Sequence, residues 1–554
     1  MLVLTTLWYI VSGAALAAGL FLVLLEALWF VARRRSVNST TAIHELPRLG
    51  NCHASGRISG NAVIAGGSIA GLATAIICSK LFEHVIIVEP DSMTEVKRTR
   101  VAQAEQIHGI QAISLQILRR IIPEFDARVV TQGGRILESN GHIKIGSTDV
   151  QFEAGSLPDT IFISRLSLER ILREYVQSIP TVRTVQGLVT GVTPDITGQR
   201  IQRVIIQVKS DSAQTIEVDT SMFADCSGPA TIGLKLLEKA QGAGWGPYPK
   251  TMYDPKISYA TASIPVPDRL KNALPIFTRQ LNEYKSFTEL GFLKSIIPHA
   301  DQDDRIVCMV HSDNGGLMCG IGGWDLPPAM RPRSFGDYVQ QVDSVWQNAS
   351  SGKSLKEDPG RMAVMDSLRA LESALEESGV TPEFKFCKMG SCYKVDYAGA
   401  PKPSNFVAIG DSFLRVNPTF GQGISKALVD VASLNGALLD ARLISTMSNG
   451  GPGWSLPGSF SIDMLTRQTP RVMHMWDSTK DSDYGRRGTE RVPGESPELG
   501  EFGRKYWRRL VQVASKDQAA ALDIFRSLHL IAPPLDLLRP SLFIRAMWCG
   551  LRAP

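Results

Sequence analysis

The chain opens with an uninterrupted run of apolar and small polar residues. No residue between Leu2 and Leu25 is charged, and an α-helix of that length measures about 36 Å, enough to cross a hydrocarbon core of about 30 Å. Aromatic residues of the kind found at membrane interfaces lie near the two ends, at Trp8, Tyr9, Trp29 and Phe30. We therefore predict a transmembrane helix within residues 1–35.

A cleaved secretory signal peptide is the alternative interpretation of this segment. Residues Ala15 to Ala17 resemble a cleavage site, but no Lys or Arg precedes them and mostly apolar sequence continues through Val31. Arg33, Arg34 and Arg35 follow directly, and the positive-inside rule places this flank, with everything after it, in the cytosol. We expect a retained single-pass anchor, in the endoplasmic reticulum membrane, with a cytosolic body.

After the anchor comes a polar stretch, and then strand-like and helix-like segments alternate. Residues 36–59 are rich in polar residues, and we interpret them as a linker. A short apolar strand over 61–65 is followed by glycines, an apolar helix over 72–82 and a second strand over 85–88. This order predicts a βαβ unit of a nucleotide-binding domain.

The turn of this unit reads Gly66-Gly67-Ser68-Ile69-Ala70-Gly71, and the second strand ends at Glu89. Gly66 permits a tight turn, Gly71 lets the helix pack closely on the strands, and the helix N-terminus offers N–H groups to a pyrophosphate. Ser68 stands where G-x-G-x-x-G has its second glycine, and Glu89 can accept hydrogen bonds from ribose hydroxyls. We predict dinucleotide binding by Gly66, Gly67, Ser68, Gly71 and Glu89.

The middle of the chain has strand-like and helical patterns but lacks nucleotide-binding motifs. Strand-like runs occupy 257–264, 305–311 and 315–321, and helical periodicity covers 335–346 and 362–377. Three aromatic residues of this region can line a substrate pocket or pack in a core: Tyr253, Tyr259 and Trp324.

Towards the C-terminus, residues 449–458 indicate a loop and 481–503 a polar excursion. Helical periodicity returns over 506–530, and residues 537–551 are apolar with isolated arginines. This last segment can pack against the body or lie on a bilayer as an amphipathic helix.

Composition narrows the class of protein. At 554 residues the chain is long enough for more than one domain. Its 59 basic and 54 acidic residues nearly balance, at a net charge of +5, which argues against a dedicated nucleic-acid binder. The eight cysteines form no C-x-x-C pair and the nine histidines no H-x-x-x-H spacing, so a metal site has no support in the sequence.

Several segments resemble, in the same order, motifs of flavoprotein monooxygenases of the aromatic-hydroxylase and epoxidase type. The glycine turn at 66–72 is similar to the first FAD fingerprint of that family. Residues 100–108 resemble its R-V-P-Q-x-x-H-x-H segment, with Ala102 for the proline and Gln106 for the first histidine. Residues 164–169 match its S-R-x-x-L-E element, whose arginine the family places against the flavin cofactor. The resemblance implies cofactor contacts from Arg100, Gln103 and Arg165.

The second FAD fingerprint of the family is similar to residues 406–423. An apolar strand over 406–409 ends at Gly410, and a proline- and glycine-containing loop leads into a helix over 424–438. Asp411 can accept a hydrogen bond from a ribityl hydroxyl, and the helix N-terminus can stabilise the negative charge of reduced flavin. Residues 224–228 resemble the middle motif. Together these segments imply contacts from Asp225, Asp411, Pro418, Gly421 and Gly423.

Each of these assignments has a purely structural alternative. Arg165 can be a solvated charge on a helix that Ser164 caps. Asp225 can cap a turn, and His108 can pack beside the apolar run that follows it. Arg100 and Gln103 can be surface residues of a loop.

The resemblance covers about residues 60–440 and implies an α/β fold, in which a Rossmann-like FAD-binding domain carries an inserted β-sheet substrate domain that covers the flavin ring. An N-terminal transmembrane helix and a C-terminal helical extension complete the chain. The expected divisions are an anchor (1–35), a linker (36–59), the FAD-binding domain (60–235) with its return segment (396–440), the substrate domain (236–395) and the extension (441–554).

The resemblance also implies a reaction: FAD, reduced by NAD(P)H, uses O2 to add one oxygen atom to a substrate. No catalytic acid or base stands out, as expected where a cofactor carries the difficult chemistry. The anchor favours a lipophilic substrate of specialised metabolism, a terpenoid, meroterpenoid or prenylated aromatic compound, which would be epoxidised or hydroxylated. A flavin-dependent reductase of polyprenyl double bonds and a non-catalytic FAD-binding membrane scaffold remain alternatives. A flavin halogenase is disfavoured because its W-x-W-x-I-P segment is absent.

Overall fold

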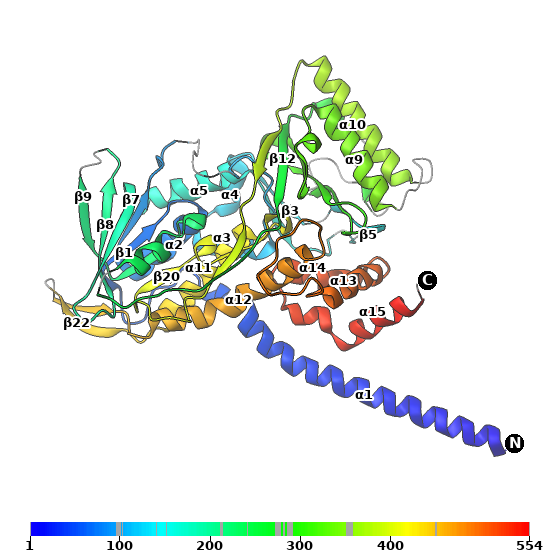
Figure 1. Cartoon of the computed structure of the whole chain (residues 1–554), viewed down its shortest axis with the longest axis horizontal. Coiled ribbons are helices and arrows are strands. Elements are labelled where there is room, and N and C mark those ends of the chain that lie inside the picture. The colour runs from blue at the N-terminus through cyan, green and yellow to red at the C-terminus, as the bar shows by residue number, and fades with distance from the viewer. Residues whose placement is uncertain are drawn as a thin grey trace.

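The computed structural model describes residues 2–95, 101, 103–139, 141–150, 152–153, 155–210, 214–240, 242–271, 279–280, 283–284, 292–350, 358–448 and 451–552. Two units built on β-sheets lie side by side, with C-terminal helices below them and a long N-terminal helix that extends away from the body (Figure 1). The mixed α/β architecture agrees with the predicted fold class.

The first unit is built on a seven-stranded sheet. In spatial order its strands are β20 (Phe406–Ala408), β10 (Met222–Asp225), β1 (Ile58–Ala65), β2 (Phe82–Glu89), β7 (Val182–Pro194), β8 (Ile201–Val208) and β9 (Thr215–Asp219). The first five are parallel neighbours, and β8 and β9 extend the sheet as antiparallel strands. The parallel strands β10 and β20 are buried along their whole length, as expected for a sheet covered on both faces.

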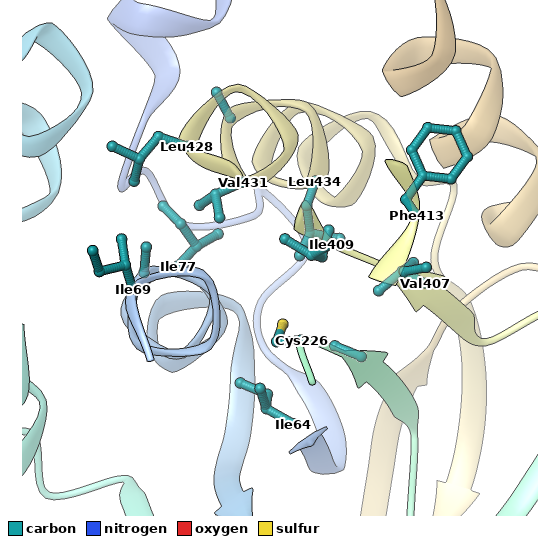
Figure 2. Packing of buried hydrophobic residues seen from close by; sticks show 14 of the residues in the cluster. Ile64, Ile69, Ile77, Cys226, Val407, Ile409, Phe413, Leu428, Val431 and Leu434 are labelled. Carbon is teal, nitrogen blue, oxygen red and sulfur yellow. The ribbon is translucent and has the colours of Figure 1, made fainter. Parts of the chain in front are cut away.

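Two helices of this unit position the candidate site. α2 (Ile69–Leu81) follows β1, and α11 (Gly423–Asp440) follows β20. Figure 2 shows Ile69 and Ile77 of α2 beside Leu428 and Val431 of α11, in one continuous core. α12 (Phe460–Asp483) packs along α11. The smaller helices of the unit are α3 (Ala112–Ile121), α4 (Phe125–Thr131), α5 (Arg165–Gln177) and α6 (Ile232–Lys239).

The second unit contains another seven-stranded sheet, covered by α9 (Phe335–Ala349) and α10 (Pro359–Glu377). Its strands, in spatial order, are β18 (Lys385–Lys388), β12 (Ile257–Ile264), β17 (Leu317–Trp324), β16 (Arg305–His311), β15 (Phe292–Ile297), β4 (Gly141–Ile145) and β5 (Thr148–Val150). The expected domain boundary at residue 236 therefore misses two strands. β4 pairs with β15 although Gly141 and its partner Phe292 are 151 positions apart, and no local pattern predicts such a long-range pairing.

Short elements connect and flank the two units. A three-stranded sheet joins β11 (Lys250–Tyr253), β19 (Cys392–Val395) and β21 (Leu414–Arg415). Two hairpin-like pairs are β3 (Arg135–Glu138) with β6 (Asp159–Phe162), and β13 (Arg279–Gln280) with β14 (Glu283–Tyr284), and α7 (Asp268–Lys271) is a single turn. Part of the predicted loop at 449–458 is strand, in the pair β22 (Ile444–Ser448) and β23 (Gly451–Ser455).

α1 (Leu2–Thr40) is one helix that is long and apolar enough to cross a membrane. The expected linker at 36–59 is wrong as a flexible spacer. The helix continues to Thr40, whose hydroxyl donates to the Ser36 carbonyl at 2.8 Å, and a 3-10 turn over Ile43–Arg48 follows. Glu45 in that turn is fully buried against Arg467 and Arg471. Arg48 and His53 of this stretch also contact the body, at the Asp440 carboxylate and the Ala441 carbonyl.

The predicted C-terminal helical extension is present. It comprises α12, α13 (Glu501–Ala514), α14 (Gln518–Leu528) and α15 (Pro540–Arg552). The helical pattern over 506–530 divides at Asp517, whose side chain caps α14 by accepting from Ala520 N. α15 buries Leu542 and Ala546 in a small core with α13 and α14, and leaves Ile544 and Trp548 exposed.

Candidate functional site

The candidate site lies where four parallel strands of the first sheet end. Gly66 follows β1, Glu89 ends β2, Asp225 ends β10, and Gly410 and Asp411 follow β20. Because β20, β10, β1 and β2 are parallel neighbours, their carboxyl ends meet at one edge. Such an edge is the usual ligand-binding position in open α/β sheets.

The glycine turn has the tight geometry that its sequence predicts. Gly66 has φ +108°, a left-handed conformation that favours glycine, and its N–H donates to Val88 O at 2.8 Å. A Cβ on Gly71 would lie 1.8 Å from the Gly66 carbonyl oxygen, and one on Gly66 would lie 2.5 Å from the Cys226 carbonyl oxygen. Neither position can accept a larger residue without moving the backbone.

The carboxylate of Glu89 is buried and holds the turn in place. One oxygen accepts from Gly67 N at 2.6 Å and the other from Asp91 N at 3.0 Å. A contact between this carboxylate and ribose hydroxyls remains a prediction.

Ser68 departs from the glycine fingerprint, and the structure shows what its side chain contacts. Its hydroxyl donates to Glu169 at 2.9 Å and accepts from Arg165 Nη2 at 3.1 Å. Glu169 in turn pairs with Arg173 at 2.6 Å, so the S-R-x-x-L-E element is fastened to the start of α2. The Arg165 guanidinium therefore lies beside a helix N-terminus, and both favour an anion there. A solvated surface role for Arg165 does not fit these contacts.

The segment around His108 lies between the two units. Arg100 and Ala102 fall outside the described residues. The Gln103 side-chain amide donates to Met389 Sδ, and Gln106 donates to Lys385 O at 2.9 Å, next to the second sheet. His108 Nε2 is 2.8 Å from Gln103 O, and burial, together with the Arg165 charge, lowers the pKa of His108 to about 3. His108 is therefore neutral, and its side chain is half-buried.

Asp225 is fully buried and surrounded by donors. It accepts from Ser227 N and Oγ, Gly233 N and Ser412 Oγ, at 2.6–3.1 Å. Burial raises its pKa, and the hydrogen bonds oppose that rise. These bonds hold the turn after β10 against the return segment, so Asp225 has the capping role. A contact with the cofactor remains a prediction.

The return segment (396–440) contributes the remaining candidate residues at the carboxyl edge of the first sheet. Asp411 is partly exposed, with one carboxylate oxygen 3.5 Å from Lys426 Nζ. The loop through Pro418 ends at Gly421, which has φ +65° and approaches Gly109 so closely that a Cβ would lie 3.1 Å from the Gly109 Cα. At Gly423, where α11 begins, a Cβ would meet nothing within 4 Å among the described residues. The start of α11 thus faces open space.

Buried polar atoms without a hydrogen bond lie around this loop. Arg415 Nε, Gln422 Oε1 and Lys426 Nζ have no hydrogen-bond partner among the described residues, and the two cations have only the Asp411 carboxylate within ion-pair distance, at 4.0 and 3.5 Å. Buried polar groups in folded proteins are almost always satisfied, so these atoms favour a polar ligand here. Together with the open start of α11 and the Arg165 cation, they fit FAD.

The sequence motifs did not predict a role for two charged residues of α11. Lys426 and Asp430 are fully buried, and Asp430 accepts from Gly410 N at 2.8 Å. Burial raises the pKa of Asp430 to about 6, against the opposing effect of the Lys426 charge. The available signal was their i, i+4 spacing on an otherwise apolar helix, where charges are rarely left without a role.

The aromatic residues of the second unit divide into two groups. Tyr253 and Trp324 are buried and donate to Asp483, so they belong to the packed interior. Tyr259 is half-buried, and its hydroxyl lies 3.4 Å from Met389 Sδ, the sulfur that Gln103 also contacts. Tyr259 therefore lies beside the segment that joins the two units.

A cavity of about 770 Å³ lies near the opposite end of α11, between the end of α1 and α12. It is lined by residues that include His44, Arg442, Arg467 and Arg471. None of the described residues predicted to hold the cofactor lines it. The length of α11, 18 residues, separates it from Gly423 by roughly 25 Å, so it is a separate feature.

Comparison with known proteins identifies the fold. No family model matches the chain. Protein Rv3254 of Mycobacterium tuberculosis is 24% identical over 396 residues, which span 68% of this chain and 73% of the relative. Two solved structures, each 13% identical, cover 89% of this chain and 99% of their own: the flavin-dependent brominase Bmp2 (TM-score 0.50) and a flavoprotein/dehydrogenase from Cytophaga hutchinsonii (TM-score 0.52). The chain therefore has a flavoprotein fold, which confirms the predicted fold class.

Proposed function

We propose that this protein is a membrane-anchored FAD-dependent monooxygenase that uses NAD(P)H and O2 to epoxidise or hydroxylate a lipophilic substrate, such as a terpenoid, meroterpenoid or prenylated aromatic compound of specialised metabolism. One observation carries the proposal: both glycine-containing turns, Arg165 and buried polar atoms that lack a hydrogen bond lie at one edge of the sheet. The flavoprotein fold and the order of the sequence motifs support it.

The residues of the chain would bind and orient the cofactor. The N-terminus of α2 and the Arg165 guanidinium attract a pyrophosphate, Glu89 accepts from ribose hydroxyls, and Asp411 accepts from the ribityl chain. The N-terminus of α11 presents partial positive charge towards the flavin ring. When bound, FAD would supply the transfer of electrons from NAD(P)H to O2. We assign no residue as acid or base.

Contacts between the two chain termini support the membrane part of the proposal. The Arg33 guanidinium donates to both oxygens of Asp536, at 2.7 and 2.8 Å, and Trp29 Nε1 donates to Leu535 O at 3.2 Å. α1 is thereby fixed beside the start of α15. A bilayer crossed by the apolar part of α1 would lie close to the exposed Ile544 and Trp548, and a lipophilic substrate could reach the body from it.

Oxygen labelling tests the reaction. Candidate substrates are chosen by comparing the metabolites of a host with and without the protein. With the right substrate under ¹⁸O₂, NAD(P)H oxidation should speed up and the product should gain one labelled oxygen atom. The measurement is mass spectrometry of the product, with unlabelled O2 in H2¹⁸O as the control. Label that comes from water would contradict the proposal.

The same assay separates the alternatives. A product that gains two hydrogens without label would identify a reductase of double bonds. A halogenated product, formed when bromide or chloride is added, would identify a halogenase, even though the chain lacks the halogenase W-x-W-x-I-P segment. Bound FAD that NAD(P)H cannot reduce with any substrate would favour a non-catalytic scaffold.

Protease protection tests the topology. In sealed microsomes, a protease added outside should digest the body beyond Arg35, because the positive-inside rule places this flank in the cytosol. Detergent-treated microsomes are the control for intrinsic cleavability. Complete protection, or a glycan on Asn348 in its Asn-Ala-Ser sequon, would place the body in the lumen and overturn the assignment.

A further inference from the structure

The last residue of α12, Asp483, joins three separate parts of the protein. Its side chain is fully buried. One carboxylate oxygen accepts from Trp324 Nε1 and Asn417 Nδ2, each at 2.8 Å, and the other accepts from Tyr253 OH at 2.8 Å. Trp324 ends β17 in the second sheet and Tyr253 ends β11 in the connecting sheet. The C-terminal extension thus reaches between the two units.

The third donor leads directly to the candidate flavin loop. Asn417 precedes Pro418, and its side-chain oxygen accepts from Thr419 N at 2.9 Å. The Asn417 amide therefore has a fixed orientation, with its nitrogen on Asp483 and its oxygen on the loop backbone. A chain of two hydrogen bonds connects the Asp483 carboxylate to the turn that enters α11.

The charge of Asp483 is not neutralised by an ion pair. Among the described residues no Lys or Arg lies within salt-bridge distance of its carboxylate. The guanidinium of Arg486 instead stacks over the Trp324 ring at 4.1 Å and donates to the carbonyls of Asp303 and Pro298. Burial raises the pKa of Asp483 to about 7, against the opposing effect of the hydrogen bonds from Trp324, Tyr253 and Asn417. Above that pH the carboxylate is ionised, and a buried charge acts on its surroundings with little screening.

We propose that Asp483 is a positioning residue for the flavin: through Asn417 it fixes the loop over 418–423, and in its ionised form its negative charge lowers the reduction potential of the cofactor bound there. The inference rests on the proposed function only in requiring FAD at this edge. Reduced flavin carries additional negative charge, so a carboxylate behind its loop disfavours the reduced state.

Two substitutions separate position from charge. Asp483→Asn keeps the size of the side chain and an oxygen for Trp324 and Asn417, while the Tyr253 hydroxyl can rotate to accept from the new amide. We expect this variant to retain FAD and, above pH 7, where the wild-type carboxyl group is ionised, to have a more positive midpoint potential by spectroelectrochemistry. Asp483→Ala leaves donors unsatisfied, and the FAD dissociation constant should rise by about tenfold.

Asn417→Ala breaks the same link at its other end and leaves the two remaining donors on Asp483. It should also raise the FAD dissociation constant about tenfold, and the double variant with Asp483→Ala should be little worse than either single one, because both remove one connection. Asp477→Asn, an exposed position on α12, is the matched control and should change neither quantity.

Additive effects of Asp483→Ala and Asn417→Ala on FAD affinity, or an unchanged potential in Asp483→Asn, would overturn the inference. These outcomes are distinct from failure of the proposed function, in which the wild-type chain itself would bind no FAD.

Discussion

Replacing Gly71 with alanine should give a protein that binds little or no flavin. The added Cβ would lie 1.8 Å from the carbonyl oxygen of Gly66, far inside van der Waals contact, and the obstacle is backbone rather than a flexible side chain. The turn and the first residues of α2 must therefore move apart, which removes the N–H groups that face the pyrophosphate. Gly71→Val, with two more methyl groups, should be at least as severe.

The measurement is the ratio of flavin to protein absorbance after purification, together with the thermal unfolding midpoint. Gly503→Ala is the matched control, because a Cβ there meets nothing within 4 Å among the described residues and alanine favours the helix interior. Stoichiometric flavin in Gly71→Ala would remove the assignment of the glycine turn to the cofactor.

Local patterns predicted the parts of the fold that local forces determine. The strands expected at 257–264 and 305–311 coincide with β12 and β16, because buried strands have short runs of apolar and β-branched residues. The glycine turn was predictable for a similar reason: the conformation at Gly66 and the close approach at Gly71 each require glycine.

Features that depend on distant partners could not be predicted in this way. Glu45 stands in a polar stretch that resembles a linker, yet its partners Arg467 and Arg471 lie more than 400 positions away. Asp483 lies in the polar stretch over 481–503, and its donors come from three other segments. A single sequence shows the charge of such residues but not the groups that compensate for it.

Ser68 shows an intermediate case. Its departure from the glycine fingerprint was visible, and so was the S-R-x-x-L-E element, but nothing in either segment connected them. The structure joins them through the hydroxyl that bridges Arg165 and Glu169. The serine that departs from the glycine fingerprint therefore contacts two residues of the S-R-x-x-L-E element.

The second large effect is expected at Glu45. Its buried carboxylate pairs with Arg467 and, at 2.9 Å, with Arg471, while Arg48 lies 3.8 Å away. Burial alone would raise the pKa of Glu45, but the hydrogen bond with His44 and the charges of Arg467 and Arg471 lower it from the ordinary 4.5 to about 2. This difference corresponds to about 3 kcal/mol of folding stability.

Glu45→Ala should therefore lower the free energy of unfolding by about 3–5 kcal/mol, the usual cost of removing one partner of a buried ion pair. Arg467 would keep Asp440 at 2.5 Å, whereas among the described residues Arg471 would keep Ser433 and His44 but no carboxylate. Glu45→Gln should lose most of the same stability, because it restores shape without charge. The exposed Glu174 provides the control, and Glu174→Ala should have little effect.

The contribution of Glu45 to folding stability should depend on pH. Because the pKa of Glu45 is lowered in the folded state, its contribution is fully present above pH 4.5 and is lost as the pH falls towards 2. The stability difference between wild type and Glu45→Ala, measured by denaturant unfolding in detergent, should therefore shrink over that range. A difference that stays constant from pH 7 to the acid limit would contradict the ion-pair account. Glu45 lies near the C-terminal end of α11, whereas the candidate flavin loop lies at its N-terminal end. Protonation of Glu45 should therefore not disturb the flavin site directly, and flavin should be released only as the protein unfolds.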